Sequence, residues 1–149
     1  MSRQQLKQLS GANSARAALK SASINIRNLR LRTFIGFNPE EMEKMQDVVI
    51  NIEINYAISE AVLDDLVEGA LDYKVITKKV ISHVEQGRFL LLEKLVSDVL
   101  LLCSDHPDVN HCRVSIDKPN ALRFADSVSL TLEYHKDLTE NLRILEKAS

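Results

Sequence analysis

Four side chains of this chain stand at positions where their chemistry could serve binding or catalysis. Glu93 interrupts the apolar run LLLEKLV, so its carboxylate either lies in water at a helix border or is held there to bind a ligand. Lys118 precedes a proline at the end of a predicted strand, where a lysine is usually solvated, although a partly buried lysine can act as an acid–base group. Tyr73 opens a predicted helix and Glu41 lies in an acidic loop, and packing and solvation are the ordinary roles of such residues. Taken singly, none of the four decides a function.

A second group of residues has the types of a zinc site. The segment CSDHPDVNHC contains Cys103, His106, His111 and Cys112. Their spacing does not match that of a common zinc finger, and the adjacent His111 and Cys112 point to opposite faces of a strand. We therefore expect packing or solvent contact for these side chains and no metal. The chain also lacks a GxSxG elbow, a P-loop and a GxGxxG turn.

Length and composition set the protein class. At 149 residues and 16.8 kDa the chain has the size of one domain, and its 45% hydrophobic and 27% charged residues are typical of a globular protein. No apolar run approaches the roughly 20 residues of a membrane-spanning helix, and a secretory signal is not apparent. Two cysteines exclude a disulfide scaffold and favour a reducing compartment, so we expect a cytoplasmic protein. The net charge of −2 argues against a dedicated nucleic-acid binder.

The first 23 residues differ in composition from the rest of the chain. They hold four of the 19 basic residues and none of the 21 acidic ones, and they are rich in Gln, Ser and Ala. Because they offer few large apolar groups, we expect a mobile extension over 1–23, a folded domain over 24–134 and a tail over 135–149. An absence of acids is also typical of an organellar transit peptide, which is the alternative interpretation.

Alternating apolar and polar residues predict four strands. In the first strand the alternation slips by one residue between Ile26 and Leu29, which indicates a β-bulge. The connection over 36–47 is polar and long for a hairpin, and long loops inside compact domains often carry function. The predicted strands span residues 24–35, 48–56, 112–116 and 128–134.

Apolar residues at helical spacing predict two helices between the second and third strands. The first begins after Asp72, whose side chain can cap it, and ends at Gly87. The second spans about residues 90–104 with a wide apolar stripe, and Pro107 prevents its continuation. A short helix in the tail is also predicted, from apolar residues on one face: Leu138, Leu142 and Leu145.

The predicted order of elements is ββααββ, an α+β fold. Two helices can cover one face of a four-stranded, mainly antiparallel sheet. Such a sheet keeps one uncovered face and two edges, and exposed edges invite pairing with another chain. Closing several sheets into a ring removes the edges, so a homo-oligomer is expected.

Five segments match one family when they are taken together: NLRLRTFIGF, QDVVINIEI, ALDYKVITKKV, RFLLLEKL and IDKPNALRFADSVSLTL. They resemble the dihydroneopterin aldolase family, and more narrowly its dihydroneopterin triphosphate 2′-epimerase branch, over residues 24–134. The aldolase branch commonly has an aromatic-rich loop after the glycine, whereas the loop here reads FNPEE. The resemblance implies the tunnelling fold (T-fold), in which four ββααββ subunits join their sheets into one barrel. It further implies that two rings stack into a homo-octamer with active sites between subunits.

The same resemblance implies roles for five residues. Glu93 would anchor the pterin by accepting hydrogen bonds from its 2-amino group and N3–H, and the backbone of Leu92 would complete that pocket. Lys118 would be the catalytic acid–base residue. Tyr73, supplied by a neighbouring subunit, would contact the substrate and assist proton transfer. Glu41 would bind the hydroxyls of the substrate side chain.

The chemistry implied by the resemblance needs neither a metal nor a cofactor. The substrate's own C6=N5 imine takes up the electrons released when the C1′–C2′ bond breaks, so protein groups need only move protons and hold geometry. Re-forming the bond on the other face of the aldehyde inverts C2′, which is the epimerase reaction. Loss of the aldehyde is the aldolase reaction, which releases glycolaldehyde and 6-hydroxymethyl-dihydropterin.

Three functions follow, with the epimerase first. The second is an aldolase acting on unphosphorylated dihydroneopterin. The third is a non-catalytic oligomer that binds pterins or purines through Glu93 without using Lys118. A metal-dependent relative such as a cyclohydrolase would need a zinc site, for which the 103–112 cluster is poorly suited. Candidate cations for a triphosphate are Arg30, Arg32, Lys44, Lys74 and Arg123.

Overall fold

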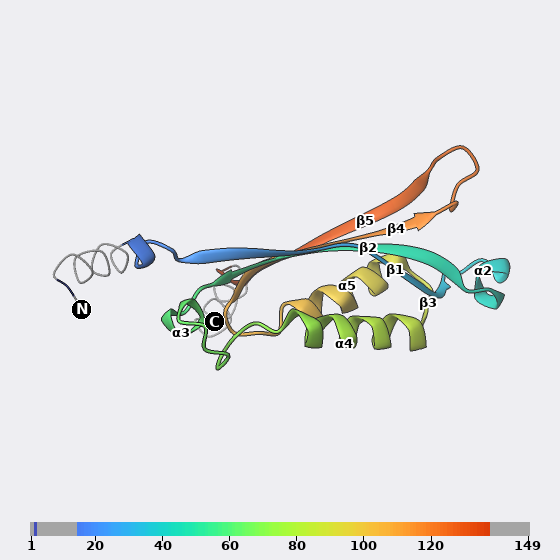
Figure 1. The fold of residues 1–149 in the computed structure, drawn as a ribbon. Coiled ribbons are helices and arrows are strands. Elements are labelled where there is room, and N and C mark those ends of the chain that lie inside the picture. Colours follow the sequence, from blue (N-terminus) through green and yellow to red (C-terminus); the bar gives the residue numbers. More distant parts are fainter. Residues whose placement is uncertain (1, 3–14, 138–149) are drawn as a thin grey trace, which may run out of the picture.

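The computed structural model describes residues 2 and 15–137, and its main elements follow the predicted order (Figure 1). In chain order the elements are β1 (Ser21–Ile35), α2 (Pro39–Glu43), β2 (Gln46–Ala57), α3 (Glu60–Leu63), α4 (Tyr73–Gln86), β3 (Arg88–Phe89), α5 (Leu92–Cys103), β4 (Val109–Pro119) and β5 (Ser127–His135). The predicted helix over residues 138–145 lies outside the described residues.

One five-stranded sheet organises the subunit, in the order β3-β1-β2-β4-β5. The four long strands pair antiparallel, as the alternation predicted. The register of β1 against β2 shifts between Ile26 and Leu29, which confirms the predicted bulge. The prediction of four strands missed β3, whose two residues pair in parallel with Phe34 and Ile35 at the end of β1. A two-residue strand is too short to show alternation, so only its tertiary pairing defines it.

The two long helices cover one face of the sheet (Figure 1). Asp72 caps α4 by accepting hydrogen bonds from the backbone N–H groups of Lys74 and Val75 at 3.0 and 3.2 Å, and α4 ends at Gly87, as predicted. The helix α5 packs against β4, β5 and α4, and α4 packs against β1. Residues of this core that are at least 98% buried include Ile50, Ile54, Val80, Val84, Leu95, Val96, Val99, Val114 and Ile116.

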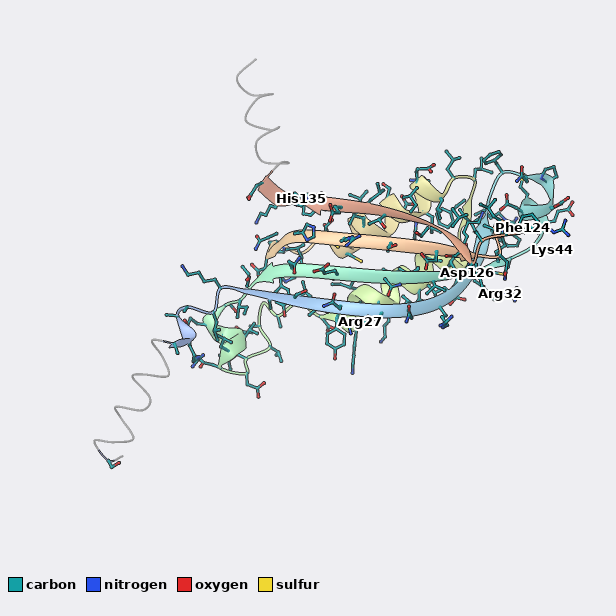
Figure 2. The ribbon with its side chains drawn as sticks, turned by 90° about the horizontal axis from the view of Figure 1, so that it is seen from above. Arg27, Arg32, Lys44, Phe124, Asp126 and His135 are labelled. Atoms are coloured by element: carbon teal, nitrogen blue, oxygen red, sulfur yellow. The ribbon has the colours of Figure 1, made fainter. Side chains whose placement is uncertain are left out.

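The opposite face of the sheet carries mostly polar side chains, and no described helix covers it (Figure 2). Arg27, Glu53, Arg113 and Asp117 line a shallow groove of about 370 Å³ on this face. The sheet therefore separates an apolar, helix-covered layer from a charged surface, the arrangement of the predicted fold class. Within the described ranges, no helix combines the length and apolar composition needed to cross a membrane.

Candidate active site

A cavity of about 630 Å³ lies at the end of the sheet where α2 and β3 are found (Figure 1). Its walls come from the end of β1, from α2, from the first turn of α5 and from the hairpin that joins β4 to β5. Glu41, Leu92, Glu93 and Lys118 all line it. The structure therefore brings four of the five predicted site residues together, although Glu41 and Lys118 are 77 positions apart in the sequence.

The position of Glu41 depends on Gly36. Gly36 ends β1 with a φ of 128°, and its backbone N–H donates to the carbonyl of Phe89 at 2.9 Å. A Cβ placed on Gly36 would overlap the carboxyl group of Glu41, so only glycine leaves room for that side chain. Pro39 at the start of α2 and the acidic residues of its first turn are favourable helix-start features, and this turn carries Glu41 back over Gly36.

Glu41 and Lys118 form a partly buried ion pair in the cavity. Lys118 Nζ lies 2.7 Å from Glu41 Oε2, and the two side chains are 12% and 23% exposed respectively. Gln46 Nε2 donates to the same carboxylate oxygen at 3.2 Å, and Asn38 Nδ2 donates to Oε1 at 3.0 Å. The hydrogen bond from Lys118 holds the pKa of Glu41 below its usual value of 4.5, against the opposing effect of partial burial. Glu41 is therefore ionised at neutral pH.

Glu93 lies in the first turn of α5, beside the cavity mouth. Its side chain is exposed, and it has no hydrogen-bonding partner among the described residues. The first N–H groups of a helix have no partner within the helix, and the positive end of the helix dipole favours a carboxylate at this position. Leu92 is half-buried and lines the same wall. This end of α5 thus offers a free carboxylate and backbone donors to a ligand in the cavity.

Tyr73 does not join these residues within one subunit. It opens α4, its side chain is 51% exposed, and it does not line the cavity. The other end of α4 leads into Gly87 and β3 beside the cavity, and 14 helical residues span about 20 Å. A role for Tyr73 in catalysis therefore requires a second subunit to bring it to the cavity.

Two residues that hold Glu41 in the cavity were not predicted from the sequence. Gln46 donates to the carbonyl of Ile35 at 2.6 Å as well as to Glu41, so it ties the end of β1 to the carboxylate. Asn38 directly precedes α2, and asparagine is a common N-cap residue, so its position could have been recognised from the sequence. Its side chain donates to Glu41 and does not cap the helix. Nothing in the local pattern around Gln46 marks it.

None of the five candidate triphosphate cations lines the cavity within one subunit. These residues are Arg30, Arg32, Lys44, Lys74 and Arg123. Arg32 pairs with Asp47 at 3.3 Å and donates to a backbone carbonyl. In Figure 2, Arg32 and Lys44 lie near Phe124 at one end of the sheet.

Cysteines and histidines of the 103–112 segment lie in different environments. Cys103 and Cys112 are buried, unpaired thiols, and the hydrogen bond between them together with burial raises the pKa of Cys103. His106 Nδ1 accepts from the backbone N–H of Asp108 at 3.1 Å. His111 lies on the polar face of the sheet, beside Asn55. The pleat separates His111 from Cys112, as expected for adjacent strand residues.

Comparison with known proteins shows the family of the chain. The profile of the FolB dihydroneopterin aldolase family matches residues 24–133, and the chain belongs to that family. It is 49% identical over 119 residues to dihydroneopterin triphosphate 2′-epimerase of Escherichia coli strain K12. The aligned region covers 80% of this chain and 99% of the relative. It is 32% identical over 116 residues to dihydroneopterin aldolase of the same strain, covering 78% of this chain and 95% of the relative.

A solved structure shows the same fold. The crystal structure of E. coli dihydroneopterin aldolase in complex with neopterin aligns with 76% of this chain and 98% of its own, with a TM-score of 0.69 and 30% identity. The predicted α+β T-fold subunit is thereby confirmed.

Proposed function

We propose that the protein is a dihydroneopterin triphosphate 2′-epimerase that inverts C2′ by retro-aldol and aldol steps. The observation that carries the proposal is the Glu41–Lys118 ion pair, which shares one cavity with the free carboxylate of Glu93. The 49% identity to a protein of that name, against 32% to an aldolase, supports the epimerase over the aldolase.

Four residues of the cavity have a task in this mechanism. The carboxylate of Glu93 accepts hydrogen bonds from the 2-amino group and N3–H of the pterin, and the backbone around Leu92 completes the anchor. The ionised carboxylate of Glu41 accepts hydrogen bonds from the side-chain hydroxyls. Lys118, at the end of β4, exchanges protons with the substrate as the C1′–C2′ bond breaks and re-forms. The electrons enter the substrate's own ring, so the protein supplies geometry and proton transfer.

We also propose that the complete site forms between subunits of a homo-octamer. The separation of Tyr73 from the cavity supports a site shared with a neighbour. Among the described residues no helix covers the polar face and no strand pairs with the outer edge of β5, which supports closure of the sheets into a ring. The two buried, unpaired cysteines support a cytoplasmic location.

A complementation experiment tests the shared site. Tyr73→Phe and Lys118→Ala subunits would each be impaired alone, and co-expression would rebuild intact sites wherever Tyr73 of one subunit meets Lys118 of the other. Random mixing would restore about a quarter of the sites. No recovery in mixed oligomers, or a fully active monomer by light scattering, would contradict a site built from two subunits.

The reaction itself is tested by product analysis. The enzyme is incubated with dihydroneopterin triphosphate and, separately, with dihydroneopterin, and epimers are separated from the hydroxymethyl product. An epimerase yields mainly the C2′ epimer from the triphosphate. Predominant release of 6-hydroxymethyl-dihydropterin would instead assign the protein as an aldolase.

A further inference from the structure

Two histidines and a glutamate converge on the polar face of the sheet. His135, one of the three, lies at the end of the sheet opposite the cavity (Figure 2). His111, Glu133 and His135 each place one ring nitrogen or carboxylate oxygen so that all three atoms lie within 4.8 Å of one another. No other group of His, Cys, Asp and Glu among the described residues meets that condition. These residues have no part in the proposed reaction.

Strand pairing builds this cluster on a rigid scaffold. Glu133 and His135 are two positions apart on β5 and therefore point to the same face. His111 on β4 is directly opposite His135, and the two ring centroids are 4.6 Å apart. Glu133 lies near both rings, with 3.4 Å from its Oε1 to His111 Nε2 and 3.8 Å from its Oε2 to His135 Nε2.

These separations are close to those of a coordinated ion. Zinc binds histidine nitrogen and carboxylate oxygen at about 2.0–2.2 Å, so tetrahedral ligands lie roughly 3.4 Å from one another. Side-chain rotations would be needed to bring the three atoms to that spacing, and the side chains of Glu133 and His135 are 48% and 46% exposed. Two histidines with one carboxylate are a ligand set that suits zinc and similar divalent ions.

A neighbouring amide orients the first histidine. Asn55 Nδ2 lies 2.7 Å from His111 Nδ1, on the strand that pairs with the other side of β4. In this placement the amide donates to Nδ1, so Nε2 carries the ring hydrogen that faces Glu133. Metal binding through Nε2 requires the ring hydrogen to move to Nδ1 and the amide to turn over, so that its oxygen accepts a hydrogen bond from Nδ1–H. Arg113 Nε approaches Glu133 only to 4.0 Å, so this guanidinium neighbours the cluster without filling it.

We propose that His111, Glu133 and His135 bind a divalent transition-metal ion, with zinc the best match to the ligand types. Three protein ligands leave one coordination position for water or another group. The bound ion would tie the end of edge strand β5 to β4. The site stands apart from the catalytic cavity, so it holds or fails independently of the proposed function.

Metal titration of the chelator-treated full chain tests the proposal. Cobalt(II) reports coordination through its visible absorption, and zinc binding is measured by calorimetry. We expect one ion per subunit, and at least roughly tenfold weaker binding in Glu133→Gln and in His135→Gln. The matched control is His83→Gln, because His83 also pairs with a carboxylate, Asp98, at 2.8 Å but has no second histidine beside it.

The binding affinities of the variants decide whether the cluster holds the ion. Wild-type affinity in His83→Gln, with loss in both cluster variants, supports the site. Circular dichroism verifies that the variants are folded, and Arg113→Gln gives a second test: removing a nearby cation should strengthen cobalt binding. No bound ion in the wild-type chain, or equal binding in the cluster variants, would overturn the proposal.

Discussion

Replacing Gly36 by alanine tests whether the geometry of the Glu41–Lys118 pair produces activity. The substitution adds a single methyl group and leaves every proposed catalytic side chain in place in the sequence. That methyl would overlap the Glu41 carboxyl group, so the Glu41 side chain must leave its position beside Lys118. Lys118 itself stays unchanged.

The expected loss in the free energy of unfolding has two parts. An alanine held at a φ of 128° is strained by roughly 1–3 kcal/mol. Loss of the 2.7 Å contact between Lys118 and Glu41, both under one quarter exposed, removes a charge-assisted hydrogen bond worth about 1.5–3 kcal/mol. Gly69 isolates the first part, because it also has a positive φ, of 74°, but nothing lies within 4 Å of an added Cβ.

The assay compares Gly36→Ala with Gly69→Ala in urea unfolding and in turnover of dihydroneopterin triphosphate. Both variants should lose stability through backbone strain, and Gly36→Ala should lose about 1.5–3 kcal/mol more. Only Gly36→Ala should lose turnover, by at least about tenfold if the displaced carboxylate positions the substrate. Wild-type turnover in a folded Gly36→Ala protein would refute the link between this ion pair and catalysis.

Three further predictions concern the same cavity. Lys118→Ala should lower turnover by about 10²–10⁴-fold while pterin affinity changes much less, as measured by rates at saturating substrate and by equilibrium binding; cleavage at the wild-type rate would show that Lys118 is not the acid–base group. Glu93→Gln should weaken pterin binding by about 2–4 kcal/mol in calorimetry without unfolding the protein, because its exposed carboxylate has no partner among the described residues. Unchanged affinity would show that Glu93 is only a solvated residue at the border of the helix. Because the folded pKa of Glu41 lies below its usual 4.5, its ion pair should stabilise the protein fully above that value and lose this contribution as the pH falls through the lowered pKa. Urea unfolding of wild type and Glu41→Gln at several pH values checks the sign, and a stability difference that grew on acidification would contradict it.

The elements that the sequence predicted are those with strong local signals. The cap at Asp72, the end at Gly87 and the bulge after Ile26 all depend on residues within a few positions of each other. Such signals lie in residues close together in the sequence, so periodicity and capping rules recover them. The short elements α2 and β3 were missed because each is only a few residues long and is defined by its packing against the end of β1.

The sequence by itself determined the ββααββ order, the polar and apolar faces of the sheet and, through family resemblance, which residues to examine. Only the tertiary structure decided that Glu41 and Lys118 pair, that Gly36 makes room for Glu41, and that Tyr73 does not line their cavity. The sequence grouped Cys103, His106, His111 and Cys112 because they are neighbours in CSDHPDVNHC. In the structure only His111 of these four belongs to the cluster of possible ligands, and its companions come from the paired strand β5. The physical reason is the same in each case: local periodicity sets which way a side chain points, whereas strand register and helix packing decide which distant side chains it meets.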